Sequence, residues 1–340
     1  MKKLLLTFCI LWMISSCTEE KVDAPFIFDN PEIAINIPAD FPEVNDSFFT
    51  NKPTKYGVEL GKKLFFDKKL SRDNTVSCAT CHIQENAFAD QNPKGIGIDG
   101  KIGFRNTPPI QNLAFMQVYN WDGNKTALEN QVLVPIITPE EMDSSILEVI
   151  GKISNDATYI ELFHKTFGDD TITGERIFNS IAQFEYTLIS ANSKYDKVKR
   201  KEGAIFTDNE AQGYQVFKNK CANCHSTELF TDQSFRNIGF PVNPNSEEKG
   251  RTRVSLNAKD LMSFRVPTLR NIAYTAPYGS FGQFATLKEV LDYLDKGVIE
   301  SDNLDPILKD NNNRIPLTEK EKENLISFMK TLSDLEFITE

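Results

Sequence analysis

The sequence predicts a mainly helical fold made of two similar tandem domains with long loops. A short helical pattern occurs twice, and each copy leads into the same Cys-x-x-Cys-His motif. Alternation of apolar and polar residues, the pattern of a half-buried strand, is scarce. Segments rich in Asn, Gly and Pro separate the helical patterns, notably residues 91–112, 239–253 and 300–316.

The two Cys-x-x-Cys-His motifs are the most informative feature. In this motif two thiols join the vinyl groups of a c-type haem, and the His ligates the iron. Two c-type haems are therefore predicted. The residues that would bind them are Cys78, Cys81 and His82 in the first motif, and Cys221, Cys224 and His225 in the second.

Zinc is the alternative ligand, because Cys-x-x-Cys pairs also supply tetrahedral zinc sites. Zinc ribbons place the second pair roughly 15–20 residues after the first. Here the pairs lie more than a hundred residues apart. Haem is therefore favoured over zinc or a redox dithiol.

The helical pattern before each motif supports two cytochrome-c-like domains. The first copy is Gly61-Lys62-Lys63-Leu64-Phe65, and the second is Gly213-Tyr214-Gln215-Val216-Phe217. Capping signals predict further helix starts. They are Thr207 with Glu210, Thr173 before a stripe of apolar residues, and Thr318 with Glu321.

Composition places the chain among soluble globular proteins. It has 340 residues, which suggests about two domains, with 40% hydrophobic and 25% charged residues. The net charge of −10 argues against nucleic acid and is compatible with a basic electron-donor protein.

The N-terminus predicts export. Lys2 and Lys3 precede a short apolar run, and residues 14–17 resemble a bacterial lipoprotein signal with cleavage before Cys17. Lipid on Cys17 would anchor the protein to a membrane on the periplasmic side without spanning it. Plain secretion is the alternative. The predicted segments are a signal peptide (1–16), a linker (17–50), an N-terminal domain (51–205) and a C-terminal domain (206–340).

Only three histidines occur, His82, His164 and His225. The motifs use His82 and His225, and His164 lies on a predicted amphipathic helix facing solvent. At most one haem can therefore have two His ligands. A haem with an open face can bind peroxide or oxygen, whereas a second axial ligand restricts it to electron transfer.

Residues 55–335 resemble the bacterial di-haem cytochrome c peroxidase family, which includes the MauG-type enzymes that oxidise a partner protein. Besides the haem motifs, the ordered set that carries the resemblance is Leu60–Asp67, Arg105–Pro108, Trp121-Asp122-Gly123, Leu128–Gln131, Glu141-Met142, Phe264–Asn271, Thr275–Tyr278 and Thr286-Leu287. The resemblance implies a peroxidatic haem on His82 and an electron-accepting haem on His225, close to the domain interface.

The resemblance also implies roles for single residues. Trp121 matches a tryptophan between the haems that can relay electrons. Glu141 matches the acid of the peroxide pocket, with Gln131 close by, and a carboxylate there can shuttle a proton. The calcium ion that lies between the domains in this family would be held by Asn106, Thr275 and Pro277 together with waters.

This chain departs from the family pattern at three places. Residues 94–102 contain no removable His, so we predict a permanently open peroxidatic haem. Leu294 occupies the usual position of the sixth ligand of the other haem, which leaves Tyr293 or Met262 as candidates. The usual His-Asp-Gly after Pro277-Tyr278 is replaced by Gly279-Ser280-Phe281-Gly282.

Three functions are consistent with these features. The leading hypothesis is a peroxidase that reduces hydrogen peroxide to water with electrons from a small cytochrome c or cupredoxin. The first alternative is a MauG-like oxidase that uses peroxide to oxidise a protein or organic substrate. The second is a non-catalytic electron-transfer lipoprotein. Family members are often dimers, so a homodimer is an expected state.

Overall fold

The computed structural model describes residues 28–242 and 247–339. Helices dominate this part of the chain, and its strands are limited to one antiparallel pair, β1 (Phe235–Arg236) and β2 (Phe264–Arg265). The prediction of a mainly helical fold is confirmed. No helix of the described residues is long and apolar enough to cross a membrane. The predicted signal peptide and the lipid-bearing Cys17 lie outside the described residues.

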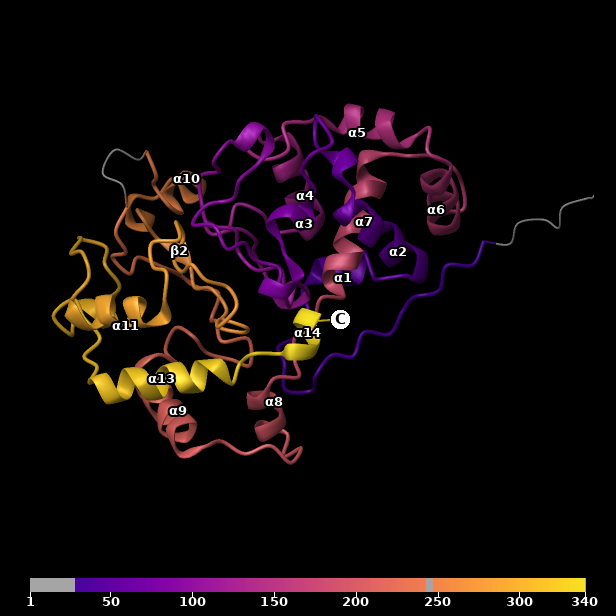
Figure 1. Ribbon diagram of the computed structural model, residues 1–340. Coiled ribbons are helices and arrows are strands. Elements are labelled where there is room, and N and C mark those ends of the chain that lie inside the picture. Colours follow the sequence, from indigo (N-terminus) through magenta and orange to yellow (C-terminus); the bar gives the residue numbers. More distant parts are fainter. Residues whose placement is uncertain (1–27, 243–246, 340) are drawn as a thin grey trace, which may run out of the picture.

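The N-terminal half gathers its helices around helix α7 (Figure 1). At Gly61 in α2, an added Cβ atom would lie 1.8 Å from the carbonyl oxygen of Ser180 in α7, so glycine permits the close approach of these helices. The elements of this half are α1 (Asp46–Thr50), α2 (Lys55–Phe66), η1 (Lys68–Leu70), α3 (Cys78–Cys81), η2 (Gln84–Asn86), η3 (Ile98–Gly100), η4 (Leu113–Phe115), α4 (Leu128–Ile137), α5 (Ile146–Ile153), α6 (Ala157–Phe167) and α7 (Gly174–Tyr186).

The C-terminal half repeats this packing with one helix pair, α9 along α13. At Gly213 in α9, an added Cβ would lie 1.9 Å from the carbonyl oxygen of Asn324 in α13. Gly61 and Gly213 are the glycines of the repeated sequence pattern, so the repeat encodes the same close contact twice. The remaining elements are α8 (Lys194–Lys199), α9 (Asp208–Lys220), α10 (Thr252–Ser255), η5 (Ala258–Asp260), α11 (Leu287–Lys296), α12 (Pro306–Lys309), α13 (Glu319–Lys330) and α14 (Leu335–Thr339).

The predicted helix starts are confirmed. Thr173, Thr207 and Thr318 cap α7, α9 and α13, and each side-chain oxygen accepts a hydrogen bond from a backbone N–H of the first turn. Thr207 and Thr318 form full capping boxes with Glu210 and Glu321. These ends could be predicted because the capping signal is local.

One short helix at the boundary of each half packs against the other half. Helix α14 follows the C-terminal half but packs on η2, where the rings of Phe337 and Phe88 lie 5.5 Å apart. Helix α8 precedes the predicted limit at 205/206, yet Tyr195 in it packs on Phe328 of α13 at 6.0 Å. Figure 1 shows α14 between the two halves and α8 below it, near α9 of the C-terminal half. The haem motifs of the two halves are therefore joined by more than the connecting chain.

Candidate haem sites

The four motif cysteines are free thiols placed for haem attachment. Cys78 and Cys81 lie on the single turn of α3, whereas Cys221 ends α9 and Cys224 follows in a turn. Burial, and secondarily the charges of Asp90 and Glu141, raise the pKa of the Cys81 thiol to about 11. Burial likewise raises the pKa of Cys221 to about 12. Haem attachment is favoured by the spacing of the two motifs and by the His that follows the second Cys of each.

Both motif histidines are oriented by a backbone carbonyl. His82 Nδ1 lies 2.8 Å from the carbonyl oxygen of Phe88, and His225 Nδ1 lies 3.0 Å from that of Phe230. Because a carbonyl can only accept, Nδ1 carries the proton and Nε2 keeps a lone pair for iron. Burial lowers the pKa of His82 to about 4, against the opposing hydrogen bond, so the ring is neutral. This geometry fits an axial haem ligand at both sites.

The acceptor carbonyls depend on strained turns. Phe88 and Phe230 have φ values of 57° and 55°, in the left-handed region that non-glycine residues rarely adopt. In both turns this conformation accompanies a carbonyl that faces the His of the preceding motif. No sequence signal marked these two positions, because neither is a Gly or Asn.

A mainly apolar cavity of about 360 Å³ lies against His225 in the C-terminal half. Phe217, Val266 and Leu291 are among its walls, and Trp121 reaches it from the N-terminal half. Large apolar pockets with few polar groups are typical of cofactor sites. With two thiols, an imidazole and this cavity together, the C-terminal site fits a haem.

The two candidate sixth ligands for this haem lie differently. Met262 lines the cavity, as does Leu294. The hydroxyl of Tyr293 instead donates to the carbonyl of Gly239 at 2.7 Å, and its ring packs on Phe284 at 5.2 Å. Met262 is therefore in the better position to face the iron, and the identity of the ligand stays a prediction.

Glu141 lies beside the first haem motif. Its carbonyl accepts from the N–H of Ile98 at 2.8 Å, and Gly97 packs against its backbone. Burial, and secondarily the charge of Glu140, raise the pKa of the Glu141 carboxyl. Its charge in turn makes a small contribution to the raised thiol pKa values of Cys78 and Cys81.

Gln131 contacts Asn120, the residue that precedes Trp121. Its Nε2 donates to Asn120 Oδ1 at 3.3 Å. Trp121 is 9% exposed, and its Nε1 donates to the carbonyl of Asn106 at 2.8 Å. The structure thus brings Gln131 and Trp121 to the same segment.

The three residues predicted to bind calcium lie close to Trp121. Asn106, Thr275 and Pro277 all line the cavity that Trp121 reaches. The Asn106 carbonyl is already the acceptor for Trp121, and its side chain donates to the carbonyl of Asn92 at 3.3 Å. Calcium binding there stays a prediction.

His164 lies near the protein surface and forms no part of either haem site. It is on α6, and its Nδ1 lies 2.6 Å from Asp170 Oδ1 at the surface. This placement agrees with the expectation of a solvent-facing side chain, which was based on the apolar periodicity of residues 159–167.

Arg265 was not predicted as a site residue. It lines the cavity, and its Nε donates only a long hydrogen bond of 3.3 Å to the carbonyl of Asn120. Burial lowers its pKa to about 10, and it forms no ion pair with a carboxylate of the described residues. Nearby Arg105, Arg236 and Arg270 all do. A partly buried cation is stabilised by a negative partner, and a haem brings two propionates.

Comparisons with known proteins agree with a di-haem enzyme. A family model described as di-haem cytochrome c peroxidase matches residues 55–204. The methylamine utilization protein MauG of Methylophilus methylotrophus is 31% identical over 289 residues, which cover 83% of this chain and 84% of that protein. The cytochrome c551 peroxidase of Nitrosomonas europaea is 33% identical over 280 residues, covering 81% and 79%.

Solved structures show the same fold. A MauG-like protein associated with microbial copper homeostasis superposes with a TM-score of 0.81 at 29% identity, covering 90% of this chain and 97% of that one. The di-haem peroxidase BthA of Burkholderia thailandensis gives a TM-score of 0.74 at 21% identity, covering 91% and 94%. The arrangement of two helical halves is thus shared with a MauG-like protein and with a di-haem peroxidase.

Proposed function

The chain belongs to the di-haem cytochrome c peroxidase family, and we propose that it reduces hydrogen peroxide to water at the haem bound through His82. Family membership implies a peroxidase with two c-type haems. The electrons would come from a small cytochrome c or cupredoxin and enter at the haem bound through His225. The observation that supports the proposal is that none of the three histidines is placed to serve as a second ligand of the haem bound through His82.

No histidine is available to close the peroxidatic haem. His82 and His225 each bind a carbonyl of their own loop through Nδ1, and His164 is paired with Asp170 at the surface. The loop of residues 94–102 carries no His and packs against the backbone of Glu141 through Gly97 and Ile98. With no histidine to displace, a haem held by His82 would be open to peroxide.

Proton transfer at this site is assigned to Glu141. Reduction consumes one peroxide, two electrons and two protons and yields two water molecules. The haem iron supplies peroxide binding and cleavage of the O–O bond. Glu141 would take a proton from the peroxide oxygen that binds the iron and return it to the peroxide oxygen that leaves as water. Its raised pKa brings the protonation equilibrium of the carboxyl closer to neutral pH.

Trp121 is assigned the electron relay between the haems. Its carbonyl accepts from the backbone N–H of Arg265 at 2.8 Å, and its indole is fixed by the Asn106 carbonyl. These bonds hold the ring on the wall of the C-terminal haem cavity. Arg265 would hold a haem propionate beside it, which supplies the negative charge that the cation lacks.

A MauG-like oxidase is the second candidate function. The observation that favours it is Leu294, which lines the C-terminal cavity where the family usually places an iron ligand. An altered ligand changes the potential of that haem and with it the direction of electron flow. In that case peroxide would be consumed while a protein or organic substrate is oxidised in place of the donor.

Location, calcium and assembly complete the proposal. Family members are periplasmic cytochromes. We extend this to anchoring on the periplasmic side through lipid on Cys17. A calcium ion at Asn106, Thr275 and Pro277 and a homodimer are part of the same proposal.

The decisive experiment is peroxide consumption by the purified di-haem protein with reduced donor cytochrome in excess. Oxidation of two donor molecules for each peroxide consumed is the expected result. Peroxide consumption without donor oxidation would favour the MauG-like function. Electron paramagnetic resonance of the ferric protein should show a high-spin haem, and a wholly low-spin spectrum would overturn the open site.

A further inference from the structure

Three successive carbonyls of the proximal loop of the C-terminal haem accept hydrogen bonds, two of them from side chains outside the loop. The Glu228 carbonyl accepts from Arg270 Nε at 2.6 Å, and the Leu229 carbonyl accepts from Thr268 Oγ1 at 2.6 Å. The next carbonyl, that of Phe230, accepts from His225 at 3.0 Å. The position of the His225 acceptor therefore depends on Arg270 and Thr268.

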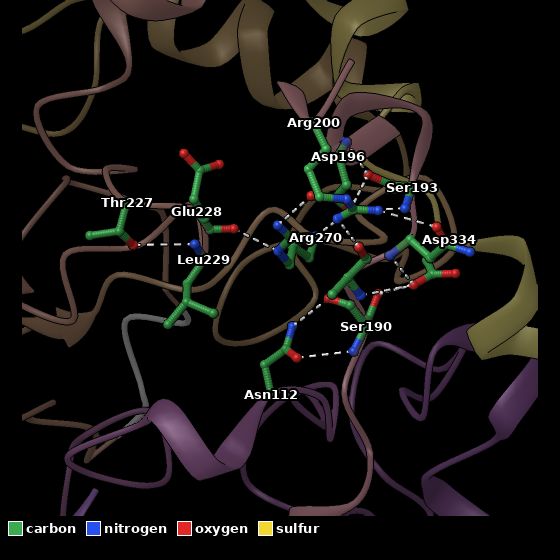
Figure 2. A network of polar contacts seen from close by, with 12 residues as sticks. Asn112, Ser190, Ser193, Asp196, Arg200, Thr227, Glu228, Leu229, Arg270 and Asp334 are labelled. Atoms are coloured by element: carbon green, nitrogen blue, oxygen red, sulfur yellow. Dashed lines mark hydrogen bonds and ion pairs between the residues drawn. The ribbon is translucent and has the colours of Figure 1, made fainter. Parts of the chain in front are cut away.

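Arg270 is itself rigidly held. Its side chain is 0% exposed and forms two hydrogen bonds with Asp196 of α8, at 2.9 and 2.8 Å (Figure 2). Its guanidinium also lies over the ring of Phe41, 4.6 Å from the centroid. Bidentate pairs of this kind fix orientation as well as charge. Because the Arg270 side chain is fixed, a shift of the Arg270 backbone would also shift the Glu228 carbonyl that the side chain binds.

Gln111 connects Arg270 to the N-terminal half. Its Nε2 donates to the Arg270 carbonyl at 2.8 Å, and its Oε1 accepts from Asn271 Nδ2 at 2.5 Å. Gln111 is 2% exposed, so these bonds have no competition from bulk water. The residue before it, Ile110, donates its N–H to the Phe88 carbonyl at 3.2 Å.

The Phe88 carbonyl is also the acceptor for His82, at 2.8 Å. A series of hydrogen bonds, linked by short backbone segments, therefore runs from His82 through Gln111 and Arg270 to His225. We infer that Gln111 and Arg270 are positioning residues that hold the two proximal-histidine loops as one unit and so set the ligand strength of both histidines. The inference rests on the proposed ligation of both irons by His82 and His225.

The physical effect acts through the Nδ1 proton. A strong hydrogen bond from Nδ1 to a carbonyl makes the imidazole a more basic ligand, which favours the ferric over the ferrous iron. If the carbonyl is released, the ligand weakens and the reduction potential rises. A bridge between both loops predicts that one substitution changes both haems.

Gln111→Leu in the holoprotein tests this prediction. Both haem reduction potentials should shift upward in a redox titration. The iron–histidine stretching band of the five-coordinate ferrous haem should shift to lower frequency. Thr268→Val removes the bond to the Leu229 carbonyl and the acceptor of the Arg270 N–H, at 3.1 Å, but leaves the bond between Gln111 and Arg270. It should raise the potential of the C-terminal haem alone.

Asn112→Gly is the matched control. Asn112 lies next to Gln111 and exchanges two bonds with Ser190, at 3.0 and 2.9 Å, but it reaches neither proximal loop. Its φ of 57° suits glycine, so only the side-chain bonds are lost. This variant should lose stability while both potentials and the stretching band stay unchanged.

Two outcomes would overturn the inference. One is unchanged potentials in Gln111→Leu at a stability loss similar to that of Asn112→Gly, and the other is a shift confined to one haem. If Gln111→Leu does not accumulate, Gln111→Glu carries the same expectation, since it keeps the acceptor for Asn271 and loses the donor to Arg270. A wild-type protein without two His-ligated haems would instead refute the proposed function.

Discussion

The two haem sites share their attachment and differ in what surrounds it. Each half presents a Cys-x-x-Cys-His motif, a glycine-mediated helix contact and a His that donates to a carbonyl in a left-handed turn. The N-terminal site adds the partly buried carboxyl of Glu141, which forms no ion pair with a described residue. The only acid on the C-terminal cavity wall formed by described residues is Asp305, which is paired with Arg236 at 2.8 Å.

Attachment alone therefore does not set the environment of each site. A carboxyl without an ion-pair partner is available for proton exchange at the N-terminal site, whereas the described C-terminal wall is mainly apolar, with one paired acid and the unpaired cation of Arg265. The following substitutions exchange or remove these differences, beginning with the largest expected effect.

Replacing Glu141 with Gln should remove the proton shuttle. We expect peroxide turnover to fall by about 10²–10⁴-fold, which is typical for loss of a general acid–base group. Because the pKa of Glu141 is raised, the wild-type rate should fall on the acid side at a pH above the ordinary range of a glutamate, as the carboxylate becomes protonated. This acid limb should be absent in the variant.

Glu140→Gln is the control, since Glu140 is the adjacent acid and lies outside the assigned shuttle. Haem content, measured as the pyridine haemochrome, should equal that of the wild type in both variants. Equal turnover in Glu141→Gln and the wild type would refute the assignment.

Buried carboxyls provide a second contrast between the halves. Burial, with a smaller contribution from Glu129, raises the pKa of Glu185 in α7 to about 8, and its Oε2 has no hydrogen-bond partner among the described residues. Burial also opposes ionisation of Asp196, but Arg270 outweighs it and lowers the pKa of that carboxyl. A raised folded pKa costs stability as the pH rises from the unfolded value toward the folded one.

Glu185→Gln should therefore leave stability nearly unchanged at pH 5 and increase the free energy of unfolding at pH 8 by about 3 kcal/mol. Asp196→Asn should decrease it by about 3–5 kcal/mol at neutral pH, because Arg270 loses its partner. Denaturant titrations at both pH values measure this, with exposed Glu175→Gln on α7 as the control. A Glu185 effect independent of pH would contradict the buried-acid explanation.

Arg265→Gln removes the unpaired cation beside the C-terminal haem. The reduction potential of that haem should fall, because a nearby positive charge favours the ferrous state. An interaction of about 1–3 kcal/mol is expected for charges several ångströms apart at a partly buried site. Arg253→Gln makes the same change in net charge at a side chain that is 59% exposed. Its effect on the potential should be much smaller, and equal shifts would exclude a local role for Arg265.

The smallest expected effect concerns the sixth ligand of the C-terminal haem. Met262→Leu should convert that haem from low to high spin, because Met262 lines the cavity. Tyr293→Phe should leave the spin state unchanged, because the Tyr293 hydroxyl is bonded to the Gly239 carbonyl. Electron paramagnetic resonance of the two variants distinguishes the ligands. A change of spin state in Tyr293→Phe would reverse the assignment.

Sequence reasoning succeeded where the signal was local. The haem motifs and the caps at Thr173, Thr207 and Thr318 each lie within a few residues of what they specify. The acceptor carbonyls of Phe88 and Phe230 could not be predicted, because their left-handed turns carry no glycine. Arg265 was noted only as part of a motif, since its lack of a carboxylate partner appears only when distant segments meet.

The contact between Phe337 and Phe88 has a consequence for the order in which the fold can form. These two side chains are separated by about 250 positions in the chain, so the contact joins segments that are far apart in sequence. Contacts of this kind form only after the intervening chain has lost loop entropy. The core beside His82 is therefore expected to be completed late in folding, after both halves have come together.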